Sequence, residues 1–359
     1  MPPACKRSDM GFCISRAVMI FALMSFQAYQ PASAKGLTIQ DLGTLPGGDY
    51  SSAEAINNRG DVVGRSRTVA NQSSEHAFLY QQGVVTDLGT LQDGDTSFAH
   101  GINDRGQVVG GAPAGPFFRH GQATHAFLYD GGVMTDLGTS TYVGSEAFGV
   151  NQHGQGQVVG TLYVGIRGEG HAFLYENGRF NDLGSLPDNP LYLDSYGAAI
   201  NNRGQVVGTA GLRIHFHEPP RAFLYENGVM KNLGTLPGDT YSYGKAINDN
   251  GQVVGESRDA ADHVHAFLYQ NGIMTSLGTL PGGSYCTASG INSRGQVVGT
   301  ADNGHGEVHG FLYENGVMTD LGTLPGGHES HALGINERGD VVGEATTASG
   351  AAHAVLWSR

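Results

Sequence analysis

The chain has 359 residues, of which 57 are glycine, and a formal net charge of −13. The length suggests two or three domains unless the chain is a repeat protein, and glycine at this density without a triplet pattern predicts many turns. The acidic charge excludes non-specific binding to nucleic acid or to an anionic lipid surface. We therefore expect neither of these as a partner.

Residues 1–34 are predicted to be a signal peptide. A basic segment precedes the apolar run "AVMIFALMSF" at 17–26, and an Ala-x-Ala cleavage site follows at 32–34. The run is too short for an ordinary membrane span, although an uncleaved anchor is an alternative. Removal of 1–34 takes away three basic residues and one acidic residue, which leaves 17 basic and 32 acidic residues and a net charge of −15.

Cys286 is the one cysteine of the predicted mature chain, so no intramolecular disulfide can form there. The fold must therefore be held by its core, even at an oxidising location. We expect an exported monomer, periplasmic or extracellular, with no stable membrane insertion after the signal peptide is removed.

The rest of the chain repeats one unit seven times. The tripeptide "VVG" recurs every 44 to 50 residues, preceded by an apolar residue and Asn and followed by "HAFLY" or a variant. The Asn residues are Asn57, Asn103, Asn151, Asn201, Asn248, Asn292 and Asn336. The "HAFLY" segments begin at His76, His125, His171, Arg221, His265, His309 and His353. A "DLGTL" segment begins at Asp41, Asp87, Asp136, Asp182, Asn232, Ser276 and Asp320.

Each unit is predicted to form four short strands, A ("AIN"), B ("VVG"), C ("HAFLY") and D ("DLG"), with D outermost. Asn-Gly between strands C and D, as in "YENGVM", is a strong hairpin signal. Seven such sheets predict an all-β, seven-bladed β-propeller with four antiparallel strands per blade. The alternative is an open β-solenoid. The predicted blades are 50–91, 92–140, 141–186, 187–236, 237–280, 281–324, and 325–359 together with 36–45.

Segment 36–45 favours the closed ring. It contains a D strand that precedes the first A strand, whereas the last unit lacks strand D. Closure therefore requires that 36–45 pairs with 353–357. Residues 35–359 are then predicted to form a single domain. The hairpin register of the other units predicts three opposed pairs: Trp357 with Ile39, Val355 with Asp41, and His353 with Gly43.

Strand alternation places the His of strand C and the Asp of strand D on one face of each sheet. We therefore expect a recurrent His–Asp contact, structural in role, that involves His76, His125, His171, His265, His309, His353, Asp41, Asp87, Asp136, Asp182 and Asp320. The repeated Asn is predicted to stabilise its turn. Ser51 and its equivalents, six residues before each Asn, either line the central channel or bond to neighbouring strands.

Units such as "HGFLYENGVMTDLGTLPGG…INERGDVVG", from His309, resemble the HAF repeat of bacterial extracellular proteins. The resemblance covers 36–359, with departures at Arg221, Gly310 and Val355. It implies an exported bacterial protein and no particular reaction. We find no sequence motif for catalysis, for a cofactor or for a metal.

The irregular D–A and B–C connections of blades two to four are the predicted ligand site. They carry aromatic, Arg and His side chains that suit a glycan or a protein segment. The candidates are Phe117, Phe118, Arg119, His120, Tyr163, Arg167, Tyr192, Arg213, His215, Phe216 and His217. Two alternatives to a binding module are a polysaccharide hydrolase or lyase with a site at the central funnel, and a structural envelope or matrix protein.

Overall fold

The computed structural model describes residues 36–69, 74–92, 94–118, 121–138, 144–164, 169–187, 194–211 and 219–359. The predicted signal peptide at 1–34 lies outside these residues. Every regular element in the described part of the chain is a β-strand. No helix there has the length and hydropathy needed to cross a membrane.

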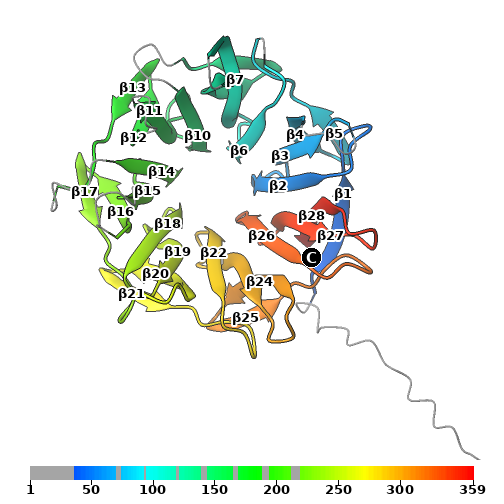
Figure 1. The fold of residues 1–359 in the computed structure, drawn as a ribbon, viewed down its shortest axis with the longest axis vertical. Coiled ribbons are helices and arrows are strands. Elements are labelled where there is room, and N and C mark those ends of the chain that lie inside the picture. Colours follow the sequence, from blue (N-terminus) through cyan, green and yellow to red (C-terminus); the bar gives the residue numbers. More distant parts are fainter. Residues whose placement is uncertain are drawn as a thin grey trace, which may run out of the picture. The chain divides into compact units, whose positions relative to one another are not determined.

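Seven four-stranded antiparallel sheets radiate from a central axis, which confirms the predicted seven-bladed propeller (Figure 1). The sheets are numbered one to seven by their innermost A strands, β2 (Ser51–Ile56), β6 (Phe98–Ile102), β10 (Gly144–Val150), β14 (Ser195–Ile200), β18 (Tyr241–Ile247), β22 (Cys286–Ile291) and β26 (Ser330–Ile335). The B strands are β3 (Val62–Arg67), β7 (Val108–Phe118), β11 (Val158–Val164), β15 (Val206–Ala210), β19 (Val253–Arg258), β23 (Val297–Asp302) and β27 (Val341–Thr346).

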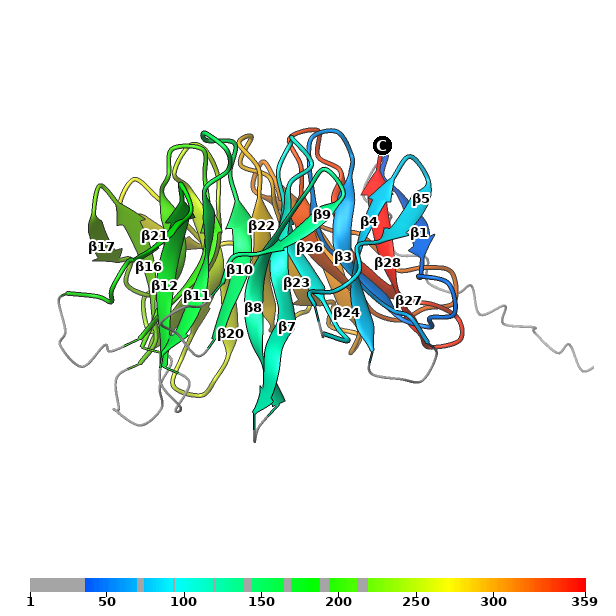
Figure 2. The same ribbon diagram turned by 90° about the horizontal axis from the view of Figure 1, so that it is seen from above.

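The C strands are β4 (Glu75–Gln81), β8 (Gly121–Asp130), β12 (Glu169–Glu176), β16 (Arg221–Glu226), β20 (Val264–Gln270), β24 (Val308–Glu314) and β28 (Ala352–Ser358). The outer D strands are β5 (Val84–Asp87), β9 (Val133–Asp136), β13 (Arg179–Asp182), β17 (Val229–Asn232), β21 (Ile273–Ser276), β25 (Val317–Asp320) and, in sheet seven, β1 (Thr38–Gly43). The A–B and C–D turns lie on one face of the ring, here called the turn face. The D–A and B–C connections lie on the opposite, loop face, where β7 and β8 project (Figure 2).

Sheet seven has the strand order β1-β28-β27-β26, so the first strand of the chain completes the last sheet. Ile39 pairs with Trp357 and Asp41 pairs with Val355, as predicted. The third predicted pair is wrong, because Gly43 pairs with Ala354 after a register shift that follows Asp41. The Gly43 N–H donates to the Asp41 carboxylate at 2.7 Å, and the φ of 76° at Gly43 is one that glycine adopts without strain.

The core consists of seven layers, each between two neighbouring sheets. In one layer Val63 of sheet one packs with Val108 and Phe127 of sheet two, and all three are fully buried. Full burial of such a side chain contributes roughly 1.5–3 kcal/mol. Because each layer needs both of its sheets, the ring is stabilised as a whole and not sheet by sheet.

The glycine of "VVG" is required by the closeness of strand A. A register shift interrupts each A–B pairing, for example between Ala53 and Ala55. There the carbonyl of Ser52 would lie 1.9 Å from a Cβ added at Gly64. The equivalent glycine of every other sheet has the same close contact, at 1.8 to 2.0 Å. A larger residue would therefore displace the strand that lines the channel.

Candidate functional site

On the turn face, the repeated Asn joins neighbouring sheets. Asn57 Oδ1 accepts the N–H groups of Arg59 and Asp61 at 3.0 and 2.9 Å, which is the predicted turn-stabilising role. Its Nδ2 also donates to the carbonyl oxygen of Asn103 in the next sheet at 3.1 Å. The same link recurs at every boundary and ends where Asn336 Nδ2 donates to the Asn57 carbonyl. Sequence reasoning did not anticipate this closed circle.

The repeated Ser is a second link between sheets. Ser97 Oγ of sheet two donates to the Gly89 carbonyl at 2.6 Å and accepts the Ala77 N–H at 2.8 Å, both in sheet one. The equivalents of Ser97 are fully buried, including Cys286, whose thiol has its pKa raised to about 12 by burial. Of the two predicted roles, the bond to neighbouring strands is therefore the one observed, and these hydroxyls are unavailable to a ligand.

The predicted His–Asp contact is present in five sheets. The His Nδ1 lies 2.7 to 2.9 Å from the carboxylate in the pairs His76–Asp87, His125–Asp136, His171–Asp182, His309–Asp320 and His353–Asp41. His265 departs from this pattern, because Ser276 occupies the Asp position; its Nδ1 lies 3.1 Å from Asp239 instead. The contacts join strands C and D, away from the channel, which fits a structural role.

Most of the predicted ligand residues lie outside the described residues: Arg119, His120, Arg167, Tyr192, Arg213, His215, Phe216 and His217. The backbone of Phe117 and Phe118 belongs to β7, and their side chains lie outside the described part of the structure. Tyr163, in β11, is the one candidate whose side chain is described, and it lines a pocket at the loop-face end of the channel.

The loop-face end of the channel has different chemistry at each sheet boundary. Three residues meet at each boundary. Two come from one sheet, namely the third residue before its repeated Asn and the residue that follows its "VVG". The third comes from the next sheet and is the fifth residue before that sheet's Asn. At the boundary of sheets two and three, His100 Nε2 lies 2.9 Å from Glu146. At the boundary of sheets five and six, Lys245 Nζ lies 2.6 Å from Glu256 and 2.8 Å from Thr287.

At the boundary of sheets three and four these positions hold Phe148, Thr161 and Tyr196, which line a pocket of about 360 Å³, called the mouth pocket below. Gly197 and Ala198 of β14 also line it. Ala198 occupies the register position that is Glu54 in sheet one, His100 in sheet two and Lys245 in sheet five. The small side chain of sheet four therefore leaves space where most other sheets place a larger one.

Two hydroxyl groups of the mouth pocket differ in their hydrogen bonding. Tyr163 Oη donates to Glu146 at 3.4 Å, and burial together with the Glu146 charge raises the pKa of Tyr163, so the phenol stays protonated. The hydroxyl of fully buried Thr161 has no hydrogen-bond partner among the described residues. Buried hydroxyls are generally hydrogen-bonded, so Thr161 is a candidate contact for a ligand or for water.

A charged cluster flanks the mouth pocket in sheet five. Burial of Glu256 by itself raises its pKa, but the ion pair and hydrogen bonds with Lys245, Arg258 and Thr287 outweigh burial and lower the pKa to about 2. Arg258 Nη2 lies 2.5 Å from Glu256. Glu256 is therefore ionised at neutral pH and holds Lys245 at the edge of the pocket. Among the described residues, no three His, Cys, Asp or Glu side chains could together hold a metal.

No family model matches the sequence, and no curated protein matches it. Similar solved structures include the β-propeller domain of the Trilobed protease from Pyrococcus furiosus (TM-score 0.56, 10% identity, covering 88% of this chain and 95% of that one). A puromycin-hydrolyzing peptidase of Mycobacterium tuberculosis has a TM-score of 0.56 at 12% identity, with 85% and 51% of the chains covered. The extracellular domain of BT4673 from B. thetaiotaomicron has a TM-score of 0.53 at 9% identity, with 89% and 40% covered.

At these identities the similarity shows the fold alone. The chain spans less than two thirds of the peptidase and of the BT4673 domain. One difference concerns closure: the Pyrococcus domain has an open Velcro topology, whereas here β1 pairs with β28. The class of protein defined by these observations is a closed seven-bladed β-propeller.

Proposed function

We propose that this protein is an exported glycan-binding module without catalysis, and that its ligand occupies the mouth pocket. The proposal rests on the boundary of sheets three and four, where aromatic side chains lie beside the small residue Ala198 and leave space for a ligand. The apolar C–H face of a sugar ring packs on aromatic side chains, while its hydroxyls need fixed donors and acceptors. Phe148, Tyr163 and Tyr196 supply the aromatic surface. His100 and Lys245 supply polar groups at the wall of the pocket.

Export and membership of the HAF repeat are parts of the same proposal. The amino-terminal segment 1–34 has the composition of a signal peptide, and one similar structure is an extracellular domain. The other predicted ligand residues belong to connections whose flanking strands end at the loop face. They would extend the site beyond Tyr163.

A glycan array followed by titration calorimetry tests the proposal. Tyr196→Ala should weaken binding of the captured glycan at least tenfold, because an aromatic anchor is removed. Tyr243→Ala is the matched control, since Tyr243 has the same register position in the next sheet and does not line the pocket. Phe118→Ala and Tyr192→Ala test the predicted loop residues. Capture of peptides and of no glycan would contradict the proposal in favour of a protein ligand.

A polysaccharide hydrolase or lyase is the second candidate, favoured by one observation. Glu146 lies within hydrogen-bond reach of both His100 and Tyr163, as one carboxylate of an acid–base site would. Release of reducing ends from a captured glycan, abolished by Glu146→Gln while binding persists, would identify an enzyme. Binding without any such release would support the module.

A further inference from the structure

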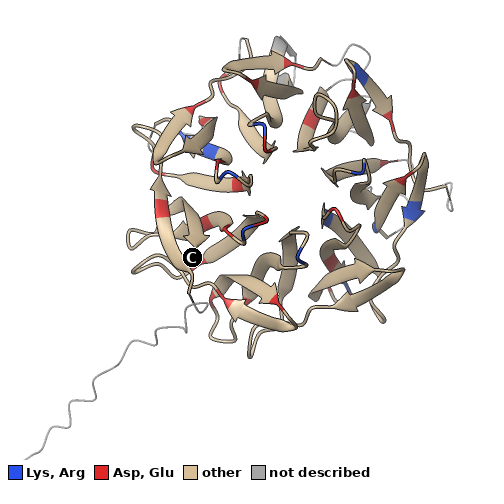
Figure 3. Ribbon diagram, turned by 180° about the vertical axis from the view of Figure 1, so that it is seen from behind, with Lys and Arg blue, Asp and Glu red and all other residues tan. Residues whose placement is uncertain are grey.

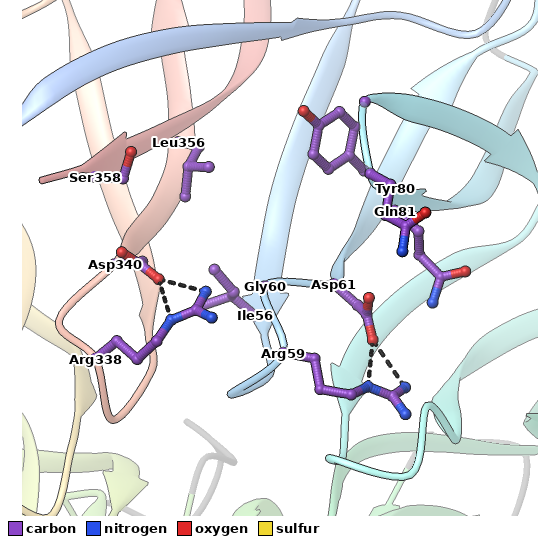
Figure 4. A pocket seen from close by; sticks show the side chains of 12 residues that line it. Ile56, Arg59, Gly60, Asp61, Tyr80, Gln81, Arg338, Asp340, Leu356 and Ser358 are labelled. Atoms are coloured by element: carbon purple, nitrogen blue, oxygen red, sulfur yellow. Dashed lines mark hydrogen bonds and ion pairs between the residues drawn. The ribbon is translucent and has the colours of Figure 1, made fainter.

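A second pocket lies on the opposite, turn face of the ring, at the boundary of sheets seven and one. Its volume is about 670 Å³, which suits a small-molecule ligand. Arg59 and Asp61 line it from sheet one, and Arg338 and Asp340 line it from sheet seven (Figure 4). The side chains of Ile56, Tyr80 and Leu356 provide apolar surface. We call it the seam pocket.

The seam pocket lies where one repeated residue of the turn face is replaced in two neighbouring sheets. In five sheets a Gln follows the repeated Asn, at a distance of four residues or, in sheet three, of six. These residues are Gln107, Gln157, Gln205, Gln252 and Gln296. Sheets one and seven carry the shorter Asp61 and Asp340 instead. The C–D hairpin of sheet one also departs, because it reads "YQQG" where sheets three, four and six read "YENG".

These replacements remove a hydrogen-bonded link that the five other sheets have. In the five other sheets, the Gln Nε2 donates to a side chain at the end of strand C, at 2.6 to 2.9 Å. An ionised Asp cannot donate such a bond. Strand C of the two seam sheets ends in Gln81 and Ser358, where sheet six has Glu314. Both side chains line the pocket.

The two ion pairs of the seam pocket present their cationic side to solvent. Arg59 Nε and Nη2 lie 2.9 and 2.8 Å from Asp61 Oδ2, and the side chains are 50% and 12% exposed. Arg338 and Asp340 repeat this arrangement at 2.9 and 2.7 Å, with 53% and 16% exposed. Each carboxylate is less exposed than the guanidinium group that it orients. Figure 3 shows basic and acidic residues close together on several of the inner turns of the ring.

We propose that the seam pocket binds a small carboxylate-bearing ligand, either a uronic acid or the carboxyl end of a peptide. A guanidinium group held by a buried Asp has already lost its rotamer freedom, so binding a carboxylate costs less ordering. Ser358, Gln81 and Gln82 supply neutral hydrogen-bonding groups for the rest of the ligand. This site is independent of the mouth pocket.

Ligand-observed NMR titration of the whole protein tests this inference with glucuronate, glucose and acetylglycine. We expect saturable binding of at least one carboxylate, and glucose bound at least tenfold more weakly. A preference for glucuronate over acetylglycine would identify the uronic acid as the source, and the reverse would identify a peptide end. Ala198→Phe, which fills the mouth pocket, should leave these titrations unchanged.

The double substitution Asp340→Gln with Ser358→Glu restores the repeat of the other sheets. It should fold as the wild type does, because five sheets already use this link, yet it should weaken carboxylate binding at least tenfold. Arg338→Gln should do the same, and Arg294→Gln, the equivalent in sheet six, should not. Failure of both carboxylates to bind, glucose binding as tight as theirs, or equal binding by the restored variant would overturn the inference.

Discussion

The two ends of the central channel differ in how much the contacts between neighbouring sheets vary around the ring. At the turn-face end, one Asn contact recurs at every boundary between sheets. At the loop-face end, the same three register positions hold an ion pair at one boundary, His and Glu at another and aromatic rings at a third. The polar contacts between neighbouring sheets use backbone groups and the repeated Asn and Ser side chains, so the other channel positions are free to vary.

This difference separates stability from recognition. Substitution of the repeated Asn breaks a buried contact between sheets, whereas substitution of a pocket-lining residue such as Ala198 changes what the channel can bind. The seam pocket is the exception, because there the turn face itself departs from the repeat. Four experiments can break or sharpen this comparison.

Deletion of 36–45 should have the largest effect. It removes β1 together with buried Leu37, Leu42 and Leu45, each contributing roughly 1.5–3 kcal/mol, and exposes the edge of β28. We expect aggregation and loss of the cooperative thermal transition, measured by calorimetry against a variant that lacks only 1–34. An unchanged melting temperature and solubility would disprove closure through β1.

Asn248→Ala should destabilise the fold by about 2–3 kcal/mol in chemical denaturation, because buried hydrogen-bonding groups lose their partners. Asn248 accepts the N–H groups of Asn250 and Gln252 and donates to the Asn292 carbonyl. The control is Ser289→Ala at the loop-face end of the next A strand, where we expect a change below about 0.5 kcal/mol. Equal effects of the two variants would remove the distinction between the ends.

Glu256→Gln should reduce the loss of folding stability that occurs when the pH is lowered from about 4.5 to 2. The pKa of Glu256 is lowered from 4.5 to about 2, so its stabilising contribution is complete above pH 4.5 and disappears as the pH falls towards 2. A shift of this size corresponds to about 3 kcal/mol. Denaturation measured between pH 6 and 2 should show a smaller loss in the variant. Parallel profiles would show that the ion pair with Lys245 does not stabilise the fold.

Ala198→Phe should change stability least and glycan binding most. The partly exposed side chain faces the mouth pocket, so a larger residue fills space without breaking a contact. Ser289→Phe is the control at the same register position of sheet six. We expect both variants to keep the wild-type melting temperature and only Ala198→Phe to lose the captured glycan. Retained binding would place the ligand elsewhere.

Much of the fold could be predicted from the repeat, because strand order and register follow from local patterns. The pairing of Trp357 with Ile39 needed only the Asn-Gly hairpins of the other units as a template. The error at Gly43 arose from a bulge after Asp41, which shifts the register by one residue. The His–Asp contact was predictable in the same way, because both residues recur at a constant separation of 11 residues in four complete sheets.

The candidate site was less predictable. Variability in the loops favoured the loop face and Tyr163, which lines the mouth pocket. The other lining residues belong to strands, where they look like ordinary variation. One available signal was missed: Ala198 is small at a position where neighbouring units carry larger side chains. The seam pocket had a similar signal in Asp61 and Asp340, which replace a repeated Gln.

By itself, the amino-acid sequence determined the number of sheets, their strand order and the position of the seam, because each depends on spacings along the chain. The tertiary structure alone decided which residues of different units meet. The Asn link, the contact of His100 with Glu146 and the two pockets all join residues from neighbouring sheets, more than 40 positions apart along the chain. Such contacts depend on how far one sheet is rotated against the next, a quantity that no single repeat encodes.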